Sequence, residues 1–430
     1  MNEDTIRLVF RLDRRAPLPG DLSYHHISGK HLWIAIGRGS VVVLDDRQHE
    51  IFERLRRGDV PRDIVAGAAD PEDCLRDVTA VVRKCGEAGF IDGFTGYRIP
   101  QSSNGATRFA RLHITRRCQF KCIHCYMDAG LQHDECEELT GDEWKEIIGN
   151  LADGGCTSII FTGGEPLIRR DCMELLKLAH DRGVENIGVM TNGLLVPRRI
   201  EELARYATAV QIGMDGADEE TNDKIRGKGT FKKIIEALDA LSRTDLDVKV
   251  SVALMEMNWQ SLRDNLAELA SRYDKSRIKF KIGKGLLDYG RATSLRDSLD
   301  TFPIQGFVAG FNASFYPPSK LRLHQELRIC GIFSQILIGH DGQVYPCHLQ
   351  HRSMGHIKDR PIREWQRLYE ASWRQYTVDH ISGCRDCDIR NLCGGSCRAL
   401  DRKRTGSEFL TSCTPDVIDK TYQNLVRIYT

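Results

Sequence analysis

The feature that most constrains the fold is a group of three closely spaced cysteines, Cys118, Cys122 and Cys125, in the run R-C-Q-F-K-C-I-H-C-Y-M-D. Their C-x3-C-x2-C spacing places all three thiols in one tight loop. A cubane iron-sulfur cluster takes four protein thiolates, so three thiolates leave one iron open to a substrate or cofactor. Three close cysteines also suit a zinc site or ordinary core packing, and the triad by itself leaves these alternatives open.

Length and charge exclude several classes of protein. A chain of 430 residues is expected to form two or three domains. Because 61 Lys and Arg nearly balance 60 Asp and Glu, there is no electrostatic case for a nucleic-acid or anionic-membrane partner. The N-terminal run lacks the apolar core of a signal peptide, and no later run has transmembrane length. We therefore expect a soluble protein of the cytoplasm.

Fifteen cysteines is a high count for such a chain, and most lie in the triad or between residues 330 and 413. A secreted disulfide framework normally occupies a small, loop-rich domain behind a signal peptide. Neither condition is met, so the pattern favours cysteines that bind a metal or a cluster.

Residues 1–95 are predicted to form a small separate domain. Alternating segments at 31–36 and 41–44 predict strands, and apolar positions every three or four residues predict helices at 47–57 and 70–88. The turn-rich stretch that follows predicts a linker at residues 96–106.

Residues 107–315 alternate between strand and helix patterns. A helix is predicted at 171–182, and another begins with the capping-box residues Thr140 and Glu143. Strands are predicted at 111–115, 158–162, 186–190, 209–214, 248–254 and 278–282. Repeated strand-helix units imply parallel strands, so we expect an α/β fold with a partial (β/α)6 barrel, its functional groups at the carboxyl ends of the strands.

Two motifs stand at these predicted strand ends. The cysteine triad follows the first strand, and T-G-G-E-P at residues 162–166 follows the second. Two glycines let the backbone approach a ligand closely, and the adjacent carboxylate can receive an ammonium group. Together these motifs resemble the radical S-adenosylmethionine (SAM) enzymes. In that family the open iron binds the amino and carboxylate groups of SAM, and one electron cleaves SAM to a 5'-deoxyadenosyl radical.

The resemblance implies that the methionine amino group is held by Gly163, Gly164, Glu165 and Pro166. The runs T-N-G at 191–193 and G-M-D-G at 213–216 occupy positions that line the ribose and methionine pocket in the family. Gly213 and Met214 depart from the serine and leucine found there, so a ribose contact by the side chain of residue 213 is excluded. Other predicted cofactor-binding side chains are Asn192, Gln211 and Asp215.

Two further SAM contacts are implied by the resemblance. Arg226, in the run N-D-K-I-R-G, is predicted to pair with the SAM carboxylate, with a surface salt bridge as the alternative. Tyr126 is predicted to lie near the adenine, with core packing as the alternative.

The C-terminal cysteines form a second pattern, and it resembles the SPASM domain, whose first members act on peptides and proteins. We expect this domain at residues 316–430. By resemblance, one auxiliary cluster is held by Cys384, Cys387, Cys393 and Cys413, and another by Cys330, Cys347 and Cys397. This gives three [4Fe-4S] clusters in all. A pair of zinc knuckles is the alternative, but it leaves Cys330 and Cys347 without a role.

Residues 319–329 contain no further cysteine, which predicts an open or unusually ligated third cluster, with His324 as a nearby side chain. Cys74, Cys85, Cys136, Cys156 and Cys172 are predicted to be buried apolar residues. His348 follows Cys347, where sulfatase-maturing members carry an aspartate that accepts a proton. A histidine can also take a substrate proton, or it can be a structural hydrogen-bond donor, and both readings stay open.

The N-terminal domain resembles the RiPP recognition element, a PqqD-like, winged-helix-like domain that docks the leader of a precursor peptide as an added strand. A winged helix with a structural or DNA-binding role is the alternative.

Taken together, the resemblances imply a radical SAM oxidoreductase that abstracts hydrogen from a ribosomally synthesised precursor peptide and installs an intramolecular C-C or thioether crosslink. Its partners would be the precursor peptide and an external flavodoxin- or ferredoxin-type electron donor. The alternatives are a maturase of a folded protein, such as a sulfatase or a quinone-cofactor subunit, and a non-catalytic iron-sulfur scaffold that binds leaders. The sequence does not decide which peptide residue is modified, or whether decarboxylation or epimerisation occurs instead.

Overall fold

The chain forms two compact units, which we describe separately. A computed structural model describes residues 13–91, 108–132, 138–283, 290–295, 307–308, 311–312, 314–316, 331–350 and 352–430. The terminal unit combines residues 1–104, 321–332 and 373–430, and the barrel unit combines residues 105–320 and 333–372. The predicted linker at 96–106 lies outside the described residues. Within the described ranges, no helix is both long and apolar enough to cross a membrane.

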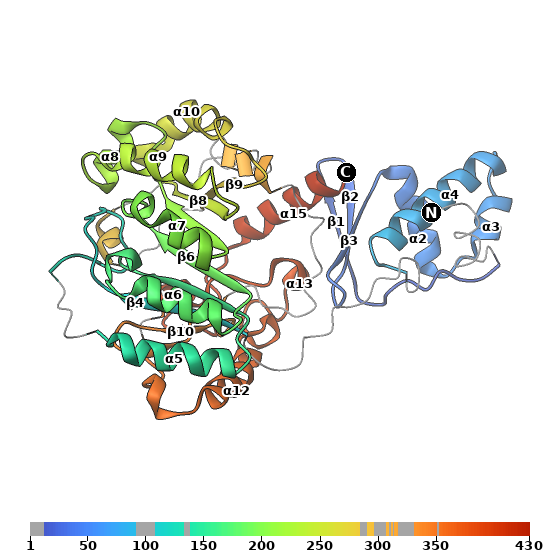
Figure 1. The fold of residues 1–430 in the computed structure, drawn as a ribbon. Coiled ribbons are helices and arrows are strands. Elements are labelled where there is room, and N and C mark those ends of the chain that lie inside the picture. Colours follow the sequence, from blue (N-terminus) through green and yellow to red (C-terminus); the bar gives the residue numbers. More distant parts are fainter. Residues whose placement is uncertain are drawn as a thin grey trace. The chain divides into compact units, whose positions relative to one another are not determined.

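The barrel unit is built on parallel strands that follow one another in sequence (Figure 1). They are β4 (Phe109–Thr115), β5 (Ser158–Gly163), β6 (Asn186–Thr191), β7 (Ala209–Gly213), β8 (Asp247–Ala253) and β9 (Ile278–Gly283). Their order β4-β5-β6-β7-β8-β9 confirms the predicted partial (β/α)6 barrel. Each predicted strand is found within two residues of its expected limits.

Helices connect these strands and bury their apolar faces against the sheet. They are α5 (Gly141–Asp153), α6 (Cys172–Asp181), α7 (Val196–Tyr206), α8 (Glu219–Arg226), α9 (Thr230–Leu241) and α10 (Trp259–Ser271). Short 3-10 turns lie at η2 (Pro166–Ile168), η3 (Glu256–Asn258) and η4 (Gly290–Ser294). The predicted capping box is present, because Glu143 N donates to Thr140 Oγ1 at 3.3 Å and Thr140 N donates to Glu143 Oε2 at 2.8 Å.

A later segment extends the barrel sheet beyond its first strand, which the sequence did not predict. β10 (Ile336–Ile338) pairs in parallel with β4, and β11 (Val344–Tyr345) pairs antiparallel with β10. The 3-10 turn η5 (Ile357–Asp359) and helix α12 (Ile362–Trp373) follow. The fully buried Trp365 donates its indole N-H to Ile357 O at 3.1 Å, which fixes α12 on that turn.

The N-terminal part of the terminal unit is an antiparallel sheet followed by helices. The strands are β1 (Leu22–Ile27), β2 (Lys30–Ala35) and β3 (Ser40–Leu44), with β2 in the centre. The helices are α2 (Asp46–Arg57), α3 (Pro61–Ala66) and α4 (Pro71–Glu87). The sequence predicted β2, β3, α2 and α4, but missed β1, whose polar sequence L-S-Y-H-H-I lacks a clear period, and α3, which is only six residues long.

Both faces of this sheet are buried. On one face Trp33, Ala35, Val42 and Leu44 pack against α2 and α4. The other face packs against α13 (Arg390–Cys393) and α15 (Pro415–Tyr429), and α15 runs beside the sheet in Figure 1. The remaining elements here are η6 (Arg374–Tyr376), η7 (Val378–His380) and α14 (Arg398–Thr405). Burial on two faces explains why β3 reads S-V-V-V-L without alternation.

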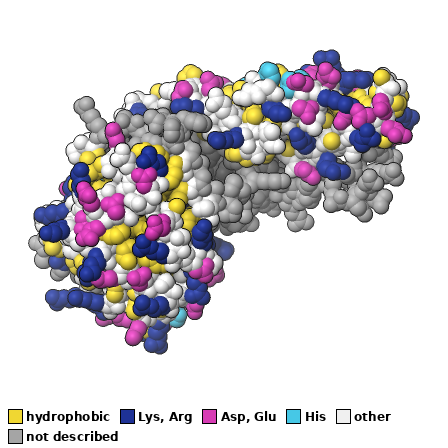
Figure 2. Space-filling view, turned by 90° about the horizontal axis from the view of Figure 1, so that it is seen from above, with side chains coloured by type: hydrophobic (Ala, Val, Ile, Leu, Met, Phe, Trp, Pro, Cys, Tyr) yellow, Lys and Arg dark blue, Asp and Glu magenta, His cyan; other side chains and the backbone are white. Residues whose placement is uncertain are grey.

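Charges of both signs are interspersed over the molecular surface that Figure 2 shows. This mixture agrees with the near-equal numbers of basic and acidic residues in the chain.

Candidate functional site

A cavity of about 370 Å³ opens at the carboxyl ends of the barrel strands. It brings together residues that lie far apart in the sequence and that were predicted to act in one site. The predicted residues lining it are Cys118, Cys122, Cys125, Tyr126, Gly163, Gly164, Asn192, Gln211, Asp215 and Arg226. Their convergence follows from the parallel sheet, because successive strands end at the same edge.

The cysteine loop is held by Arg291, a residue that the sequence did not point to. Its backbone N-H donates to Cys125 O and its Nε donates to Cys122 O, both at 2.9 Å. Its Nη1 also donates to Asp128 Oδ1 at 2.7 Å. The preceding Gly290 has φ +58°, and a Cβ there would lie 2.4 Å from Cys125 O, so this approach requires glycine. No local motif marks Arg291, which reaches the loop from η4.

The three thiols sit in a partly buried, cation-bearing environment. Burial raises the pKa of Cys118 to about 11 and also raises that of Cys122. The guanidinium groups of Arg226 and Arg291 act in the opposite direction on Cys122. Thiols of this kind lose their protons when they bind a metal. Three thiols facing one cavity beside two cations fit a thiolate-bound iron-sulfur cluster.

Gly163 and Gly164 let strand β5 pack directly on the start of the cysteine loop. A Cβ on Gly163, whose φ is +134°, would lie 2.2 Å from Thr115 O. A Cβ on Gly164 would lie 2.2 Å from Arg117 O. The glycine pair is therefore a packing requirement of the loop as well as a lining of the cavity.

Glu165 is fully buried behind these glycines and links the ends of β5 and β6. Its Oε1 accepts from Thr191 Oγ1 at 2.7 Å and from Leu167 N at 3.1 Å. Its Oε2 accepts from Asn192 N at 2.7 Å. Burial raises the pKa of Glu165 to about 7. Glu165 and Pro166 do not belong to the lining described above, and their contact with the SAM ammonium group stays a prediction.

Arg226 forms a largely enclosed ion pair rather than a surface one. Its Nε donates to Asp215 Oδ2 at 2.6 Å, and the two side chains are 11% and 0% exposed. His124 Nε2 also lies 3.1 Å from Asp215 Oδ2. Burial disfavours the Asp215 carboxylate, but Arg226 and His124 outweigh this effect and hold its pKa well below the usual range. Both partners of Asp215 lie in the cavity lining.

The departure from serine at position 213 has a structural reason. A Cβ on Gly213 would lie 2.4 Å from Arg226 Nη2, so a larger residue would displace the guanidinium. Glycine at this position leaves room for the Asp215–Arg226 pair.

Tyr126 and His348 are neighbours in the barrel unit. Their rings meet edge to face, with centroids 6.0 Å apart. Burial raises the pKa of Tyr126 to about 12. His348 does not belong to the described lining of the cavity, whereas Tyr126 does. The adjacent Cys347 is buried in the same unit.

The terminal unit gathers Cys384, Cys387, Cys393 and Cys413. Burial raises the pKa of Cys413, and the charges of Cys393 and Cys384 raise it further. The same two neighbours act on Cys387. Among the described residues, no three cysteine, histidine or acidic side chains stand as ligands of a single metal ion. These four cysteines supply the type and number of donors that a [4Fe-4S] cluster takes. Cys397 precedes α14 in the same unit, whereas Cys330 and His324 lie outside the described residues.

Cys85, Cys156 and Cys172 are buried, as the sequence predicted. Cys74 is half-buried, and Cys136 lies outside the described residues.

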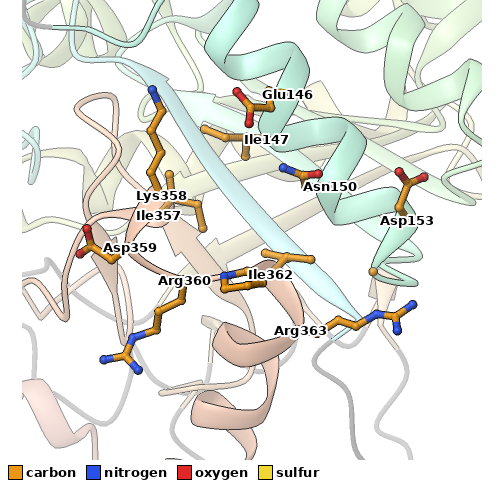
Figure 3. A pocket seen from close by; sticks show the side chains of 12 residues that line it. Glu146, Ile147, Asn150, Asp153, Ile357, Lys358, Asp359, Arg360, Ile362 and Arg363 are labelled. Carbon is orange, nitrogen blue, oxygen red and sulfur yellow. The ribbon is translucent and has the colours of Figure 1, made fainter.

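A wider cavity of about 620 Å³ lies between α5 and the segment 357–363 (Figure 3). Glu146, Asn150 and Asp153 border it from α5, and Lys358 and Arg363 border it from the other side. Its described lining contains neither a thiol nor an imidazole, so we place the cofactor chemistry at the strand ends instead.

Two family models match the chain. The model of the "Radical SAM superfamily" matches residues 112–269, which cover β4 to α10. The SPASM model, an "Iron-sulfur cluster-binding domain", matches residues 330–388.

The curated relatives include enzymes with different substrates. The chain is 36% identical over 332 residues to the Fe-coproporphyrin III synthase of Methanosarcina barkeri, covering 66% of this chain and 82% of that protein. It is 30% identical over 312 residues to the mycofactocin maturase MftC of Mycolicibacterium smegmatis, covering 66% and 76%. It is 26% identical over 318 residues to the PqqA peptide cyclase of Bradyrhizobium diazoefficiens, covering 69% and 82%.

Among solved structures, the fold is similar to that of SuiB of Streptococcus suis bound to precursor peptide SuiA. The TM-score is 0.57 at 13% identity, and the match covers 93% of this chain and 99% of that one. It is also similar to anSMEcpe with bound AdoMet, with a TM-score of 0.54 at 16% identity over 74% of this chain and 98% of that one.

Proposed function

Because the chain belongs to the radical SAM superfamily, we propose that this radical SAM enzyme acts on a ribosomally synthesised precursor peptide. One observation carries the choice of substrate. The fold match to SuiB bound to precursor peptide SuiA covers 93% of this chain, which supports a peptide substrate. The relatives named PqqA peptide cyclase and mycofactocin maturase also favour a peptide substrate.

We assign the strand-end cavity to the cofactor. A cluster and SAM, when bound there, supply the one-electron chemistry and the carbon radical that removes a hydrogen atom from the substrate. Cys118, Cys122 and Cys125 would hold the cluster. The buried Arg226 presents a cation for the SAM carboxylate, and the amides of Asn192 and Gln211 offer hydrogen bonds to the ribose.

We also assign roles to the aromatic residues beside the cavity and to the auxiliary clusters. Tyr126 would contact the adenine, and His348 beside it would take a proton from the substrate. Two auxiliary clusters would complete a set of three [4Fe-4S] clusters, fed by an external flavodoxin- or ferredoxin-type donor in the cytoplasm. The product would be a peptide with an intramolecular C-C or thioether crosslink.

The leader would dock on the N-terminal sheet. β3 is an edge strand, and Lys84 of α4 donates to Val43 O at 2.9 Å. A leader strand added between β3 and α4 would replace this side-chain hydrogen bond with backbone ones. Holding the leader there raises the effective concentration of the peptide core near the barrel.

A tetrapyrrole is the second candidate substrate. It is favoured by one specific observation, the 36% identity to Fe-coproporphyrin III synthase. A substrate comparison separates the two candidates. The anaerobically reconstituted enzyme is given SAM, a reductant and either the peptide encoded beside its gene or Fe-coproporphyrin III, and 5'-deoxyadenosine and product masses are measured.

We expect peptide-dependent 5'-deoxyadenosine and a peptide that has lost hydrogen, with no change in the porphyrin. A variant in which Cys118, Cys122 and Cys125 are all alanine serves as the control and should form neither product. Conversion of the porphyrin with an unchanged peptide would overturn the peptide assignment.

Hydrogen exchange tests the docking site. Adding the full precursor peptide should slow amide exchange in residues 40–44, while exchange in helix α5 of the barrel unit stays the same. Unchanged exchange in residues 40–44 at saturating peptide would exclude docking on β3.

A further inference from the structure

The two ends of the chain share one hydrophobic core in the terminal unit. Leu32, Ile34, Val41 and Val43 of the N-terminal sheet pack against residues that follow the predicted cluster ligands. The residues they contact are Ile389, Leu392, Tyr422, Leu425 and Val426. Cys387 and Cys393 are themselves packed against this cluster. The sheet therefore packs against two of the four cysteines that we propose as ligands of one auxiliary cluster.

A hydrogen-bonded anchor fixes the start of the cysteine-bearing loop to the sheet. Asp388, which directly follows Cys387, accepts hydrogen bonds from Ser23 Oγ and His25 Nε2, both at 2.5 Å. It also accepts one from Tyr422 Oη at 2.6 Å. Asp388 is only 16% exposed, and a carboxylate at such a site needs these donors.

A second contact fixes the end of the same loop. Asn391 Nδ2 donates to Ile36 O at 2.6 Å, at the end of β2. A Cβ on Gly39, whose φ is +60°, would lie 2.9 Å from Asn391 O, so the turn before β3 approaches the loop closely. The loop from Cys387 to Cys393 is thus attached to the N-terminal sheet at both ends.

We propose that the N-terminal sheet is a structural support of the auxiliary iron-sulfur site. Ser23, His25 and Tyr422 are positioning residues, which hold Asp388 and through it the thiol of Cys387. This inference rests on the proposed cluster at Cys384, Cys387, Cys393 and Cys413. The proposed leader-docking domain and a cofactor site would then share one folding unit. Neither leader docking nor cluster binding by itself requires such a link.

Strand β1 offers a matched pair of variants. His25 stacks on Tyr422 with ring centroids 3.9 Å apart, so His25→Phe keeps a ring there while it removes the donor to Asp388. His26, the next residue, stacks instead on His31 at 4.9 Å. The test variant combines Ser23→Ala with His25→Phe, and His26→Phe is its control.

The measurement uses the full-length holoprotein after anaerobic reconstitution. Iron and sulfide per chain, the EPR signal of the reduced auxiliary cluster, and the rate of iron release to a chelator are recorded. In the double variant, iron release from the auxiliary site should be about tenfold faster, because hydrogen bonds to a buried charge are lost. The His26→Phe protein should release iron at the wild-type rate.

A second pair tests the apolar contact. Val43 and Val42 are adjacent in β3 and nearly equally buried, at 2% and 3% exposure, but Val43 faces the loop whereas Val42 faces α2 and α4. Val43→Ala should speed iron release, whereas Val42→Ala should not. Thermal unfolding of each variant checks that it is folded.

The outcomes separate this inference from the cluster assignment. The Cys384→Ala, Cys387→Ala variant tests the cluster assignment. If it loses iron while the Ser23→Ala, His25→Phe variant and Val43→Ala release iron at the wild-type rate, the supporting role alone is disproved. If the cysteine variant keeps its full iron content, these cysteines hold no cluster, and the supporting role is disproved as well.

Discussion

At the scale of single residues, the strand-end cavity depends on a buried set of compensating charges. Asp215 is enclosed and paired with Arg226 and His124, and the Arg226 guanidinium occupies the space that a Cβ on residue 213 would need. Removing one partner of a buried pair leaves an uncompensated charge, which costs several kcal/mol. We therefore expect a substitution at position 213 that seems conservative by family resemblance to be destabilising here.

Gly213→Ser restores the residue that related enzymes carry, and we expect it to destabilise the barrel unit. The added Cβ would displace Arg226, so the free energy of unfolding should fall by about 1–3 kcal/mol. Gly283→Ala is the matched control, because its Cβ would lie 3.5 Å from Val252 O in ordinary contact. Denaturant unfolding of the cofactor-free protein measures both. Equal stability of the two variants would contradict the displacement of Arg226.

Glu165 should make stability depend on pH in the opposite sense to an ordinary carboxylate. Its pKa is about 7 in the folded state and 4.5 for the free side chain, so the folded chain binds the proton more tightly. The stabilisation is complete below pH 4.5 and is lost as the pH rises through 7, by up to about 3 kcal/mol. Glu165→Gln should remove this slope, as measured by unfolding the cofactor-free protein between pH 4.5 and 8. A slope that survives in the Gln variant would show that another group causes it.

At the scale of elements, α5 is positioned by its first turn. The capping box of Thr140 and Glu143 satisfies backbone N-H groups, and Lys358 Nζ lies 2.6 Å from Glu143 Oε1. The same residues therefore begin the helix and tie it to the turn η5. The Lys358 ammonium, together with Thr140, lowers the pKa of Glu143 to about 2.

Thr140→Ala should destabilise the barrel unit by about 1 kcal/mol, the usual cost of a lost N-cap. Lys145→Ala, on the same helix, is the control, because exposed ion pairs such as its contacts with Asp142 and Glu174 contribute little. Both are compared by thermal unfolding at neutral pH. A control that is destabilised as much as Thr140→Ala would argue against the cap.

Sequence patterns located the elements that have strong periodicity. The six barrel strands, the capped helix α5 and helices α2 and α4 were found because apolar spacing and caps are local signals. Strands β10 and β11 were missed because they are two to three residues long and owe their structure to pairing, β10 with β4 and β11 with β10. β1 was missed because its two faces meet different partners, the His31 stack and Asp388.

At the scale of the whole molecule, the N-terminal segment is part of the fold of the terminal unit. Deleting residues 1–95 would expose apolar side chains of α13 and α15, including Leu392, Tyr422 and Leu425. We expect the truncated chain to aggregate and to bind a hydrophobic dye, because a large apolar face has lost its cover. Light scattering and dye fluorescence against the full-length chain check this. A monodisperse truncated chain with full iron content would contradict it.

This expectation changes how leader binding is best tested. Loss of peptide binding on deletion of residues 1–95 would not separate a missing docking site from a collapsed terminal unit. Hydrogen exchange on the intact chain avoids this problem.

The sequence by itself determined which residues meet at the carboxyl ends of the barrel strands. Cysteine spacing, the glycine pair at 163–164 and strand periodicity are local patterns, and they were sufficient to place the triad, the six strands and the residues that meet at their ends. Tertiary structure alone decided that Arg291 holds the cysteine loop, that Gly213 makes room for Arg226, and that the N-terminal sheet packs under Cys387 and Cys393. Two of these contacts join residues more than a hundred positions apart, and the contact at Gly213 depends on how closely the Arg226 guanidinium approaches the backbone. They therefore leave no periodic or spacing signal in the chain.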